Sequence, residues 1–161
     1  MCCGVDTLDN ISEHNLEQLN KCLEKLSLKE LLIWCLSLPN IGQVTSFGSS
    51  GMVIIHEIFD ILKMNEDISS SFPIIFIDTL HHFSETIEFV ERVEDRYDIH
   101  SNLYRYKCAF ANTRESFEKY VDDKQLWLSN PLIYDQLVKV EPLQRALNEL
   151  NIKIWITGRR R

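Results

Sequence analysis

The segment 45–51, with the sequence TSFGSSG, combines hydroxyl groups and glycines in a way that suits phosphate binding. It contains four hydroxyl side chains and two of the chain's five glycines, and an apolar helical pattern follows it. At the start of a helix, unpaired backbone N–H groups and the helix dipole attract anions, and glycine lets a ligand approach the backbone. The segment is neither a Walker A loop nor a G-x-G-x-x-G motif. We therefore predict a phosphate cradle here, the alternative being an ordinary capped turn.

A carboxylate and two histidines follow the next apolar run. Residues 73–77 are continuously apolar, and Asp78, His81 and His82 come soon after them. Asp78 could accept hydrogen bonds from the ring or sugar of a ligand. Adjacent histidines rarely ligate one metal ion because their side chains point apart, so we expect no metal site. Each histidine is expected to be satisfied by the protein or to contact a ligand.

Basic residues form the third group with possible chemistry. Three arginines, residues 159–161, follow Gly158 after the last apolar run. Guanidinium groups bind phosphate and sulfate through paired hydrogen bonds, and the alternative is a charge run in solvent. Lys139 and Arg145 flank the start of a helix, where they either face one cleft or pair with Glu141 at the surface.

Alternating strands and helices must position these groups. Strand patterns cover residues 41–47, 73–77, 99–106 and 152–157. Helical patterns cover residues 28–35, 52–62, 84–97, 113–121 and 133–139, with a loop at 127–131 and a further helix from Glu141. The core-facing stripe of that last helix is expected to be Val140, Leu143, Leu147 and Leu150.

This alternation implies an α/β fold with a mostly parallel sheet flanked by helices. Such sheets bind ligands at the carboxyl ends of their strands. That rule selects residues 46–51, 78–83 and 158–161, so the three groups are expected to meet at one edge of the sheet.

Composition excludes several classes of protein. The 161 residues are 45% hydrophobic and 25% charged, as in one globular protein with a core. A net charge of −7 argues against nucleic-acid binding. The first residues lack a basic segment followed by an apolar run, so we expect no signal peptide, and no apolar run reaches the roughly 20 residues that a membrane span needs. Five cysteines without a C-x-x-C motif argue against a disulfide framework and a closed zinc site, so we expect a cytoplasmic protein with reduced thiols.

Five short motifs occur in a characteristic order and spacing. They are residues 45–48 (TSFG), 76–83 (FIDTLHHF), 139–142 (KVEP), 145–146 (RA) and 157–160 (TGRR). Together they resemble the phosphoadenylyl sulfate (PAPS) reductase family, in its fungal form, within the adenine nucleotide α-hydrolase-like superfamily. The resemblance covers about residues 40–161. It implies an adenine nucleotide α-hydrolase-like domain at residues 27–161, preceded by a helical or irregular extension at residues 1–26.

The resemblance also implies a reaction and a set of binding residues. PAPS is reduced to sulfite, adenosine 3′,5′-bisphosphate is released, thioredoxin supplies the electrons, and family members often form homodimers. The cradle would hold the phosphosulfate end, Asp78 and Thr79 the adenosine, and the basic residues the phosphates and sulfate. The substrate-binding residues expected on this basis are Thr45, Ser46, Phe47, Gly48, Ser49, Ser50, Asp78, Thr79, Lys139, Arg145, Gly158, Arg159 and Arg160.

The chain departs from the family at the catalytic cysteine. The family nucleophile lies in a Glu-Cys-Gly-x-His motif near the C-terminus, which this chain lacks, and Cys3 stands at the wrong end. We therefore assign no catalytic residue and expect the domain to be C-terminally truncated. Two interpretations stay open: a PAPS reductase completed by a further segment, and a module that binds PAPS or adenosine 3′,5′-bisphosphate without turnover. An ATP-pyrophosphatase-type loop would require an aspartate that segment 45–51 lacks.

Two further differences from relatives bear on the loops and on cofactors. Leu80 stands where many relatives have glycine, and Ser84 where many have proline. In adenylyl sulfate reductases a cysteine pair that holds an iron–sulfur cluster precedes the lysine, whereas here Leu137 and Val138 precede Lys139. The resemblance therefore implies no cofactor, no iron–sulfur cluster, and PAPS rather than adenylyl sulfate as the substrate.

Overall fold

The computed structural model describes residues 13–64 and 72–158, so Arg159 and Arg160 of the expected site lie outside the described residues. The chain divides into two compact units between Leu38 and Pro39, which is later than the expected boundary at residues 26 and 27. Within residues 13–64 and 72–158, no helix has the length and apolar character that crossing a membrane requires.

The first unit contains helices α1 (Glu13–Leu23) and α2 (Leu28–Leu36). Helix α2 begins at a capping box, in which Glu30 N–H donates to Ser27 Oγ at 3.3 Å and Ser27 N–H donates to the Glu30 carboxylate at 2.8 Å. This exchange satisfies backbone donors that the first turn of a helix leaves unpaired. The helix predicted from residue 28 is therefore confirmed.

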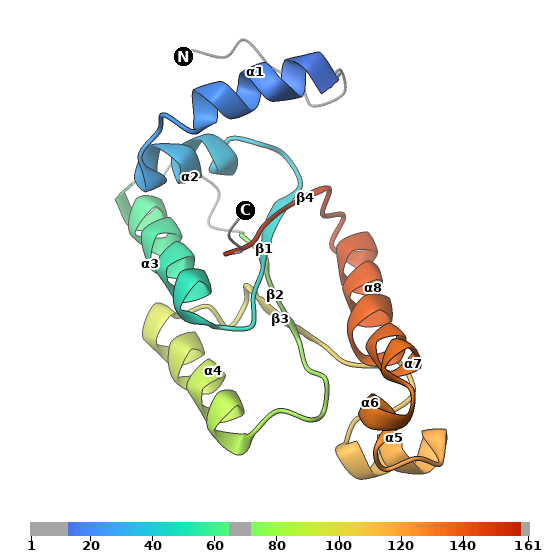
Figure 1. Ribbon diagram of the computed structural model, residues 1–161. Helices are drawn as coiled ribbons and strands as arrows, with labels where there is room; N and C mark the ends of the chain where they lie inside the picture. The colour runs from blue at the N-terminus through green and yellow to red at the C-terminus, as the bar shows by residue number, and fades with distance from the viewer. Residues whose placement is uncertain (1–12, 65–71, 159–161) are drawn as a thin grey trace. The chain divides into compact units, whose positions relative to one another are not determined.

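The second unit is built on a four-stranded parallel sheet with the order β3-β2-β1-β4 (Figure 1). Its strands are β1 (Ile41–Val44), β2 (Ile74–Ile77), β3 (Leu103–Tyr106) and β4 (Ile154–Ile156). The register pairs Gln43 with Ile74, and every pairing in the sheet is parallel. The predicted α/β fold with a parallel sheet is confirmed, although the strands are shorter than predicted.

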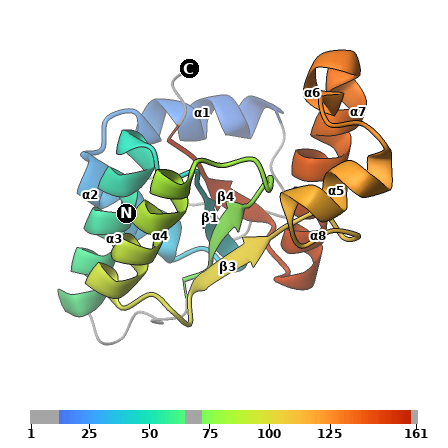
Figure 2. The ribbon, with the colours of Figure 1, turned by 90° about the horizontal axis from the view of Figure 1, so that it is seen from below.

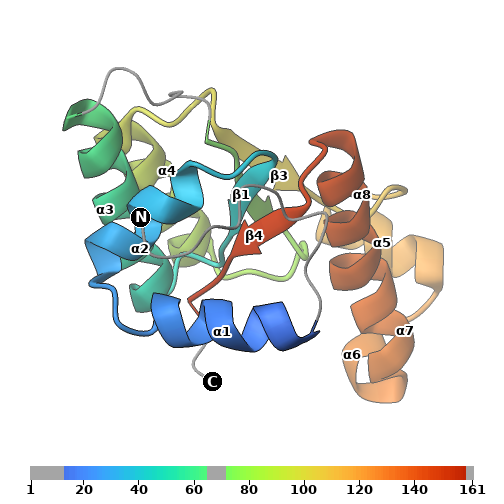
Figure 3. The same ribbon diagram turned by 90° about the horizontal axis from the view of Figure 1, so that it is seen from above.

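Helices cover both faces of this sheet. Helices α3 (Ser49–Met64) and α4 (Ser84–Tyr97) lie on one face, and α8 (Glu141–Glu149) lies on the other, as Figures 2 and 3 both show. Ile55, Ile58 and Ile61 of α3 are fully buried, in keeping with the apolar start predicted for this helix. Beneath α8, Ile75, Ala146 and Ile152 form a buried cluster.

A small helical region follows β3. It contains α5 (Arg114–Val121), α6 (Leu126–Ser129) and α7 (Pro131–Asp135). The predicted loop at 127–131 was wrong, because residues 126–129 form one helical turn. This turn is fixed at its start, where Gln125 N–H donates to Asp123 at 2.8 Å, and by the buried side chain of Leu126. A single turn is too short to show helical periodicity in a sequence.

Helix α7 continues without a break through a π-helix (Gln136–Val140) into α8. The π-helix ends two residues before Pro142, whose ring would collide with the carbonyl four residues earlier in a regular helix. The wider π turn makes room for it. A helix does begin at Glu141, as predicted, but it extends an existing helix.

The π turn also changes which residues face the core. Val140 was expected in the buried stripe but is 38% exposed, whereas Val138, Pro142 and Ala146 are buried. A π turn inserts one extra residue, which shifts the buried positions relative to a regular helix. Leu147 and Leu150 do pack against the cluster beneath α8, but their side chains are only partly buried.

Candidate functional site

The carboxyl ends of the four strands lie at one edge of the sheet, because all four strands are parallel. Lys107, Asp78, Thr45 and the Thr157–Gly158 pair follow β3, β2, β1 and β4 in the order of the sheet. Residues from distant parts of the sequence therefore share one edge, as predicted. This edge is the candidate site.

Thr45 and Phe47 fix the loop after β1. Thr45 Oγ1 accepts a hydrogen bond from Phe47 N–H at 3.0 Å. Phe47 has a φ of 59°, a left-handed conformation that costs energy for a residue with a side chain. Its ring is buried and packs edge-on against Phe76 at 5.6 Å between centroids. Phe47 is thus an anchor of the loop, while the expected ligand contacts Ser46 and Gly48 are exposed.

Helix α3 presents its N-terminus at the end of this loop. Met52 N–H donates to the Gly48 carbonyl at 3.0 Å, so the N–H groups of Ser49 and Ser50 precede the first bond of the helix. Both serines are exposed, and the first turn contains no acidic residue. The arrangement provides hydroxyls, free N–H groups and the positive end of a helix dipole, which together suit an anion.

Gly51 allows the helix to approach the strand. A β-carbon at Gly51 would lie 2.3 Å from Thr45 Oγ1, so only glycine fits without movement. The buried Gln43 donates from Nε2 to the Gly51 carbonyl at 3.0 Å. Strand β1 and the first turn of α3 are therefore held together both by contact and by a hydrogen bond.

Gly158 brings the end of β4 against the same helix terminus. A β-carbon on Gly158 would lie 2.6 Å from Ser50 Cβ and 3.2 Å from Gly51 N. Two of the three segments selected from the sequence thus touch. Arg159 and Arg160 are the next residues in the chain but lie outside the described residues.

Asp78 is paired within the protein. Its side chain accepts a hydrogen bond from Leu80 N–H at 2.9 Å and forms an ion pair with Lys107 Nζ at 3.3 Å. The residue is 9% exposed, so this pair neutralises a nearly buried carboxylate. Leu80 has a φ of 64°, which explains in physical terms why glycine suits this position.

The two histidines have different surroundings. His81 Nδ1 donates to the Thr79 carbonyl at 2.8 Å, and His82 Nε2 donates to the Ile77 carbonyl at 3.2 Å. The His82 ring stacks on Phe76 at 5.1 Å. In the described part of the chain, no group of three metal-ligating side chains is close enough to hold a metal ion.

His81 lies in an aromatic cluster formed by the small helical region. Its ring centroid is 5.6 Å from Phe117, 5.2 Å from Trp127 and 5.4 Å from Tyr134. The Nε2 atom of His81 is buried and has no hydrogen-bond partner in the described structure. This packing connects the loop after β2 to α5, α6 and α7.

Tyr134 connects two of the expected binding residues. Burial raises the pKa of Tyr134, while a hydrogen bond with Thr79 and the charge of Lys139 oppose that rise. The Lys139 ammonium lies 5.8 Å from the Tyr134 ring centroid and 2.6 Å from Asp135. Lys139 thus pairs with Asp135 rather than with Glu141, and it stands beside the aromatic cluster.

Arg145 supports the end of β3. It donates to Glu141 at 2.8 Å and to the Lys107 carbonyl, and its guanidinium lies 5.3 Å from the Tyr106 ring centroid. Burial, followed by a hydrogen bond to Glu149, raises the pKa of Tyr106 to about 12. The pairing of Arg145 with Glu141 is one of the two alternatives that the sequence left open.

Lys107 and Tyr134 are the residues that sequence reasoning missed. Lys107 follows the carboxyl end of β3, so the rule applied to the other three strands would also have selected it. Tyr134 comes from α7, and nothing in its local sequence indicates contact with Thr79.

Two of the described cysteines, Cys35 and Cys108, do not resemble nucleophiles. Burial raises the pKa of Cys35 to about 11 and also raises the pKa of Cys108. A reactive cysteine has a lowered pKa, since the thiolate is the attacking form. Cys22 is a half-buried free thiol, while Cys2 and Cys3 lie outside the described residues.

Comparison with protein families and known proteins gives a consistent result. The family described as phosphoadenosine phosphosulfate reductase domain matches residues 40–161. A probable phosphoadenosine phosphosulfate reductase of Schizosaccharomyces pombe is 40% identical over 150 residues, covering 92% of this chain and 53% of the relative. The phosphoadenosine phosphosulfate reductase of Emericella nidulans is 40% identical over 149 residues, covering 91% of this chain and 47% of the relative.

A solved structure is also similar. The crystal structure of PAPS reductase from Candida auris, a phosphate complex, superposes with a TM-score of 0.82 at 40% identity. The similarity covers 94% of this chain and 70% of that chain. This chain spans about half the length of the curated relatives it matches.

Proposed function

Because this chain belongs to the phosphoadenosine phosphosulfate reductase family, we propose that it is the substrate-binding α/β part of a PAPS reductase. The proposed reaction reduces PAPS to sulfite and adenosine 3′,5′-bisphosphate, with reduced thioredoxin as the donor of two electrons. The close packing of Gly158 against Ser50 supports this proposal, because it places the end of β4 beside the helix terminus that we propose to bind an anion.

In this proposal the substrate lies along the carboxyl edge of the sheet. The N-terminus of α3, with Ser46, Ser49 and Ser50, binds the phosphosulfate end through N–H and hydroxyl donors. Thr79 contributes to the adenosine pocket. Asp78 orients that segment, since Lys107 and Leu80 N–H already occupy its carboxylate.

Basic residues complete the proposed site in two ways. Lys139, Arg159 and Arg160 supply positive charge for the phosphates and the sulfate. Arg145 acts as a positioning residue, because its guanidinium is engaged by Glu141 and by the carbonyl of Lys107.

The reduction itself needs a thiolate that attacks the sulfur of the substrate. Sulfur passes from the sulfate to the sulfite oxidation state, and the two thiols of thioredoxin become a disulfide. We assign no catalytic residue among the described ones, since burial raises the pKa of both Cys35 and Cys108. This observation favours a second candidate function, in which the chain binds PAPS or adenosine 3′,5′-bisphosphate without turnover.

We also propose that the chain works without an iron–sulfur cluster. Val138 is fully buried in an apolar cluster, and Leu137 packs against it. The position that would carry a cysteine pair is thus part of the core. The free thiols of Cys22, Cys35 and Cys108 support a reducing, cytoplasmic location. We also propose that the protein forms a homodimer.

One experiment tests the binding and the chemistry separately. The chain is titrated with adenosine 3′,5′-bisphosphate by calorimetry, and sulfite release from PAPS with reduced thioredoxin is measured on the same sample. Binding without sulfite supports the module without turnover, and binding with sulfite supports the reductase. No binding would overturn both.

A double substitution locates the site. Arg159→Ala with Arg160→Ala should weaken binding of adenosine 3′,5′-bisphosphate at least tenfold, because charge-assisted contacts are lost. Ser49→Ala should cost less, because a neutral hydroxyl contributes less than a guanidinium. Equal affinities for the arginine variant and the unaltered chain would remove these arginines from the site.

A further inference from the structure

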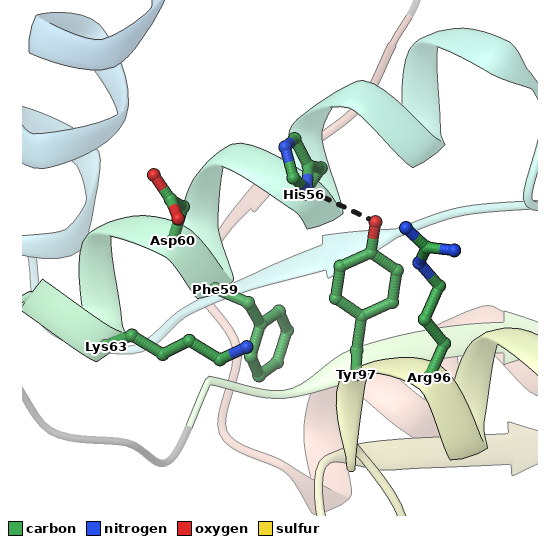
Figure 4. A pocket seen from close by; sticks show the side chains of 6 residues that line it. All are labelled: His56, Phe59, Asp60, Lys63, Arg96 and Tyr97. Carbon is green, nitrogen blue, oxygen red and sulfur yellow. Dashed lines mark hydrogen bonds between the residues drawn. The ribbon is translucent and has the colours of Figure 1, made fainter.

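A pocket of about 280 Å³ lies between α3 and α4 (Figure 4). Its lining residues are His56, Phe59, Asp60, Lys63, Arg96 and Tyr97. Its lining on α3 begins at His56, about 10 Å along the helix from Ser49 at a rise of 1.5 Å per residue, and extends to Lys63, about 20 Å away, and it shares no residue with the cradle. The pocket is therefore separate from the site proposed above.

Aromatic side chains form one part of this pocket. Phe59 is buried, and its ring centroid is 6.2 Å from that of Tyr97. Tyr97 is held by His56, through a hydrogen bond of 3.3 Å between its hydroxyl and Nδ1 and through an edge contact at 6.1 Å (Figure 4). The half-buried ring of Tyr97 and the small accessible part of Phe59, tilted by 47° to each other, thus form the apolar part of the lining.

Positive charge forms the other part. Neither Lys63 nor Arg96 has an ion-pair partner within residues 13–64 and 72–158. The Arg96 guanidinium lies 5.9 Å from the Tyr97 ring centroid, which holds it beside the aromatic surface. Glu94 and Asp95, the acidic residues that precede Arg96, are engaged by Arg105 and His100.

Asp60 is the acidic member of the lining. In Figure 4 its carboxylate points away from the Arg96 guanidinium. Two cations, a histidine and one carboxylate therefore surround the aromatic rings, in a chain whose net charge is −7. The local charge balance favours an anion, against the charge of the chain as a whole.

We propose that this pocket binds a small planar anion, namely a single aromatic ring that carries a carboxylate or a phosphate group. The ring packs mainly on Tyr97, and its anionic group is attracted by Lys63 and Arg96, which lie on either side of the two aromatic rings in Figure 4. A cavity of roughly 150 Å³ holds benzene, so 280 Å³ has room for one ring and its substituent. The site stands independently of the cradle and of the reductase function.

The test is an NMR titration of the ¹⁵N-labelled chain with four probes. Phenyl phosphate and benzoate carry both recognised features, inorganic phosphate carries only the charge, and benzyl alcohol carries only the ring. We expect at least one of the first two to shift the amide signals of Phe59 and Tyr97, with at least tenfold higher affinity than either single-feature probe. Comparing phenyl phosphate with benzoate shows which anionic group the pocket prefers.

A charge-removing variant provides the second arm. Lys63→Gln with Arg96→Gln should weaken binding of the better aromatic anion at least tenfold, whereas Lys119→Gln with Lys153→Gln should leave it unchanged. All four side chains are exposed, so both variants should keep the thermal unfolding temperature of the chain.

Three outcomes would overturn the proposal. In the first, neither aromatic anion shifts the pocket signals, or the shifts are confined to Ser49–Gly51 and Gly158, which would place binding at the cradle. In the second, inorganic phosphate binds the pocket as tightly as phenyl phosphate, which would mean a cationic patch without a ring site. In the third, both double variants bind alike.

Discussion

Gly158 and Ser50 are packed so closely that a β-carbon on Gly158 would lie 2.6 Å from Ser50 Cβ. Gly158→Ala should therefore force the end of β4 away from α3, and overpacking of this kind costs about 1–3 kcal/mol of unfolding free energy. Urea denaturation measures that loss. Gly48→Ala is the matched control, since a β-carbon there meets nothing within 4 Å, and its stability should be unchanged. Equal stability of the two variants would contradict the close contact.

Lys107→Met should leave the Asp78 carboxylate without its ion-pair partner. Asp78 is 9% exposed, and an unpaired buried charge is costly, but Lys107 is partly exposed, so we expect a loss of about 1–2 kcal/mol. Adding Asp78→Asn should recover part of this loss, which a double-mutant cycle in urea would measure. Strictly additive losses would show that the two residues do not interact.

Stability should fall in alkaline solution because of Tyr106. Burial and the Glu149 hydrogen bond raise its pKa to about 12, so the folded protein retains the phenol proton longer than the unfolded chain does. The resulting stabilisation is complete below pH 10, the ordinary value for tyrosine, and is lost as the pH rises through about 12. Thermal unfolding of Tyr106→Phe should lack this component. The same pH profile for both proteins would refute the assignment.

Tyr134→Phe removes the hydroxyl of Tyr134 and keeps its aromatic ring, so it tests the contribution of the hydroxyl alone. The ring keeps its contacts with His81 and Trp127, while the hydrogen bond with Thr79 is lost, at a cost of about 1 kcal/mol. We expect weaker binding of adenosine 3′,5′-bisphosphate as Thr79 becomes less ordered, measured by calorimetry. Tyr120→Phe, at an exposed position, should change neither quantity. If Tyr134→Phe binds as tightly as the unaltered chain, Tyr134 has no role in the site.

Local sequence patterns were enough to predict the sheet and much of the candidate site. A continuous apolar run marked β2 and a short strand pattern at residues 41–47 marked β1. The rule for parallel strand ends then selected the segments around Ser49, Asp78 and Gly158. These predictions depend only on periodicity and on where a strand ends, and both can be read within a few residues of sequence.

The remaining features depend on contacts between distant segments or on very short elements. Strand β3 is an edge strand with only Leu103 buried, so its pattern was weak and the role of Lys107 was missed. The contact of Tyr134 with Thr79 depends on how α7 packs. The π turn before Pro142 is an adjustment of backbone geometry that residue type alone does not indicate.

The contact of Gly158 with Ser50 has a consequence for biosynthesis. Within the described residues, strand β4 is the last of the four strands along the sequence, and β1 is its one neighbour in the sheet. A nascent chain on the ribosome can therefore form the loop and helix of the cradle early. The packing of Gly158 against that helix can form only after β4 has been synthesised. Ligand binding at the complete cradle, and the protection from unfolding that binding confers, are thus reserved for chains synthesised through β4.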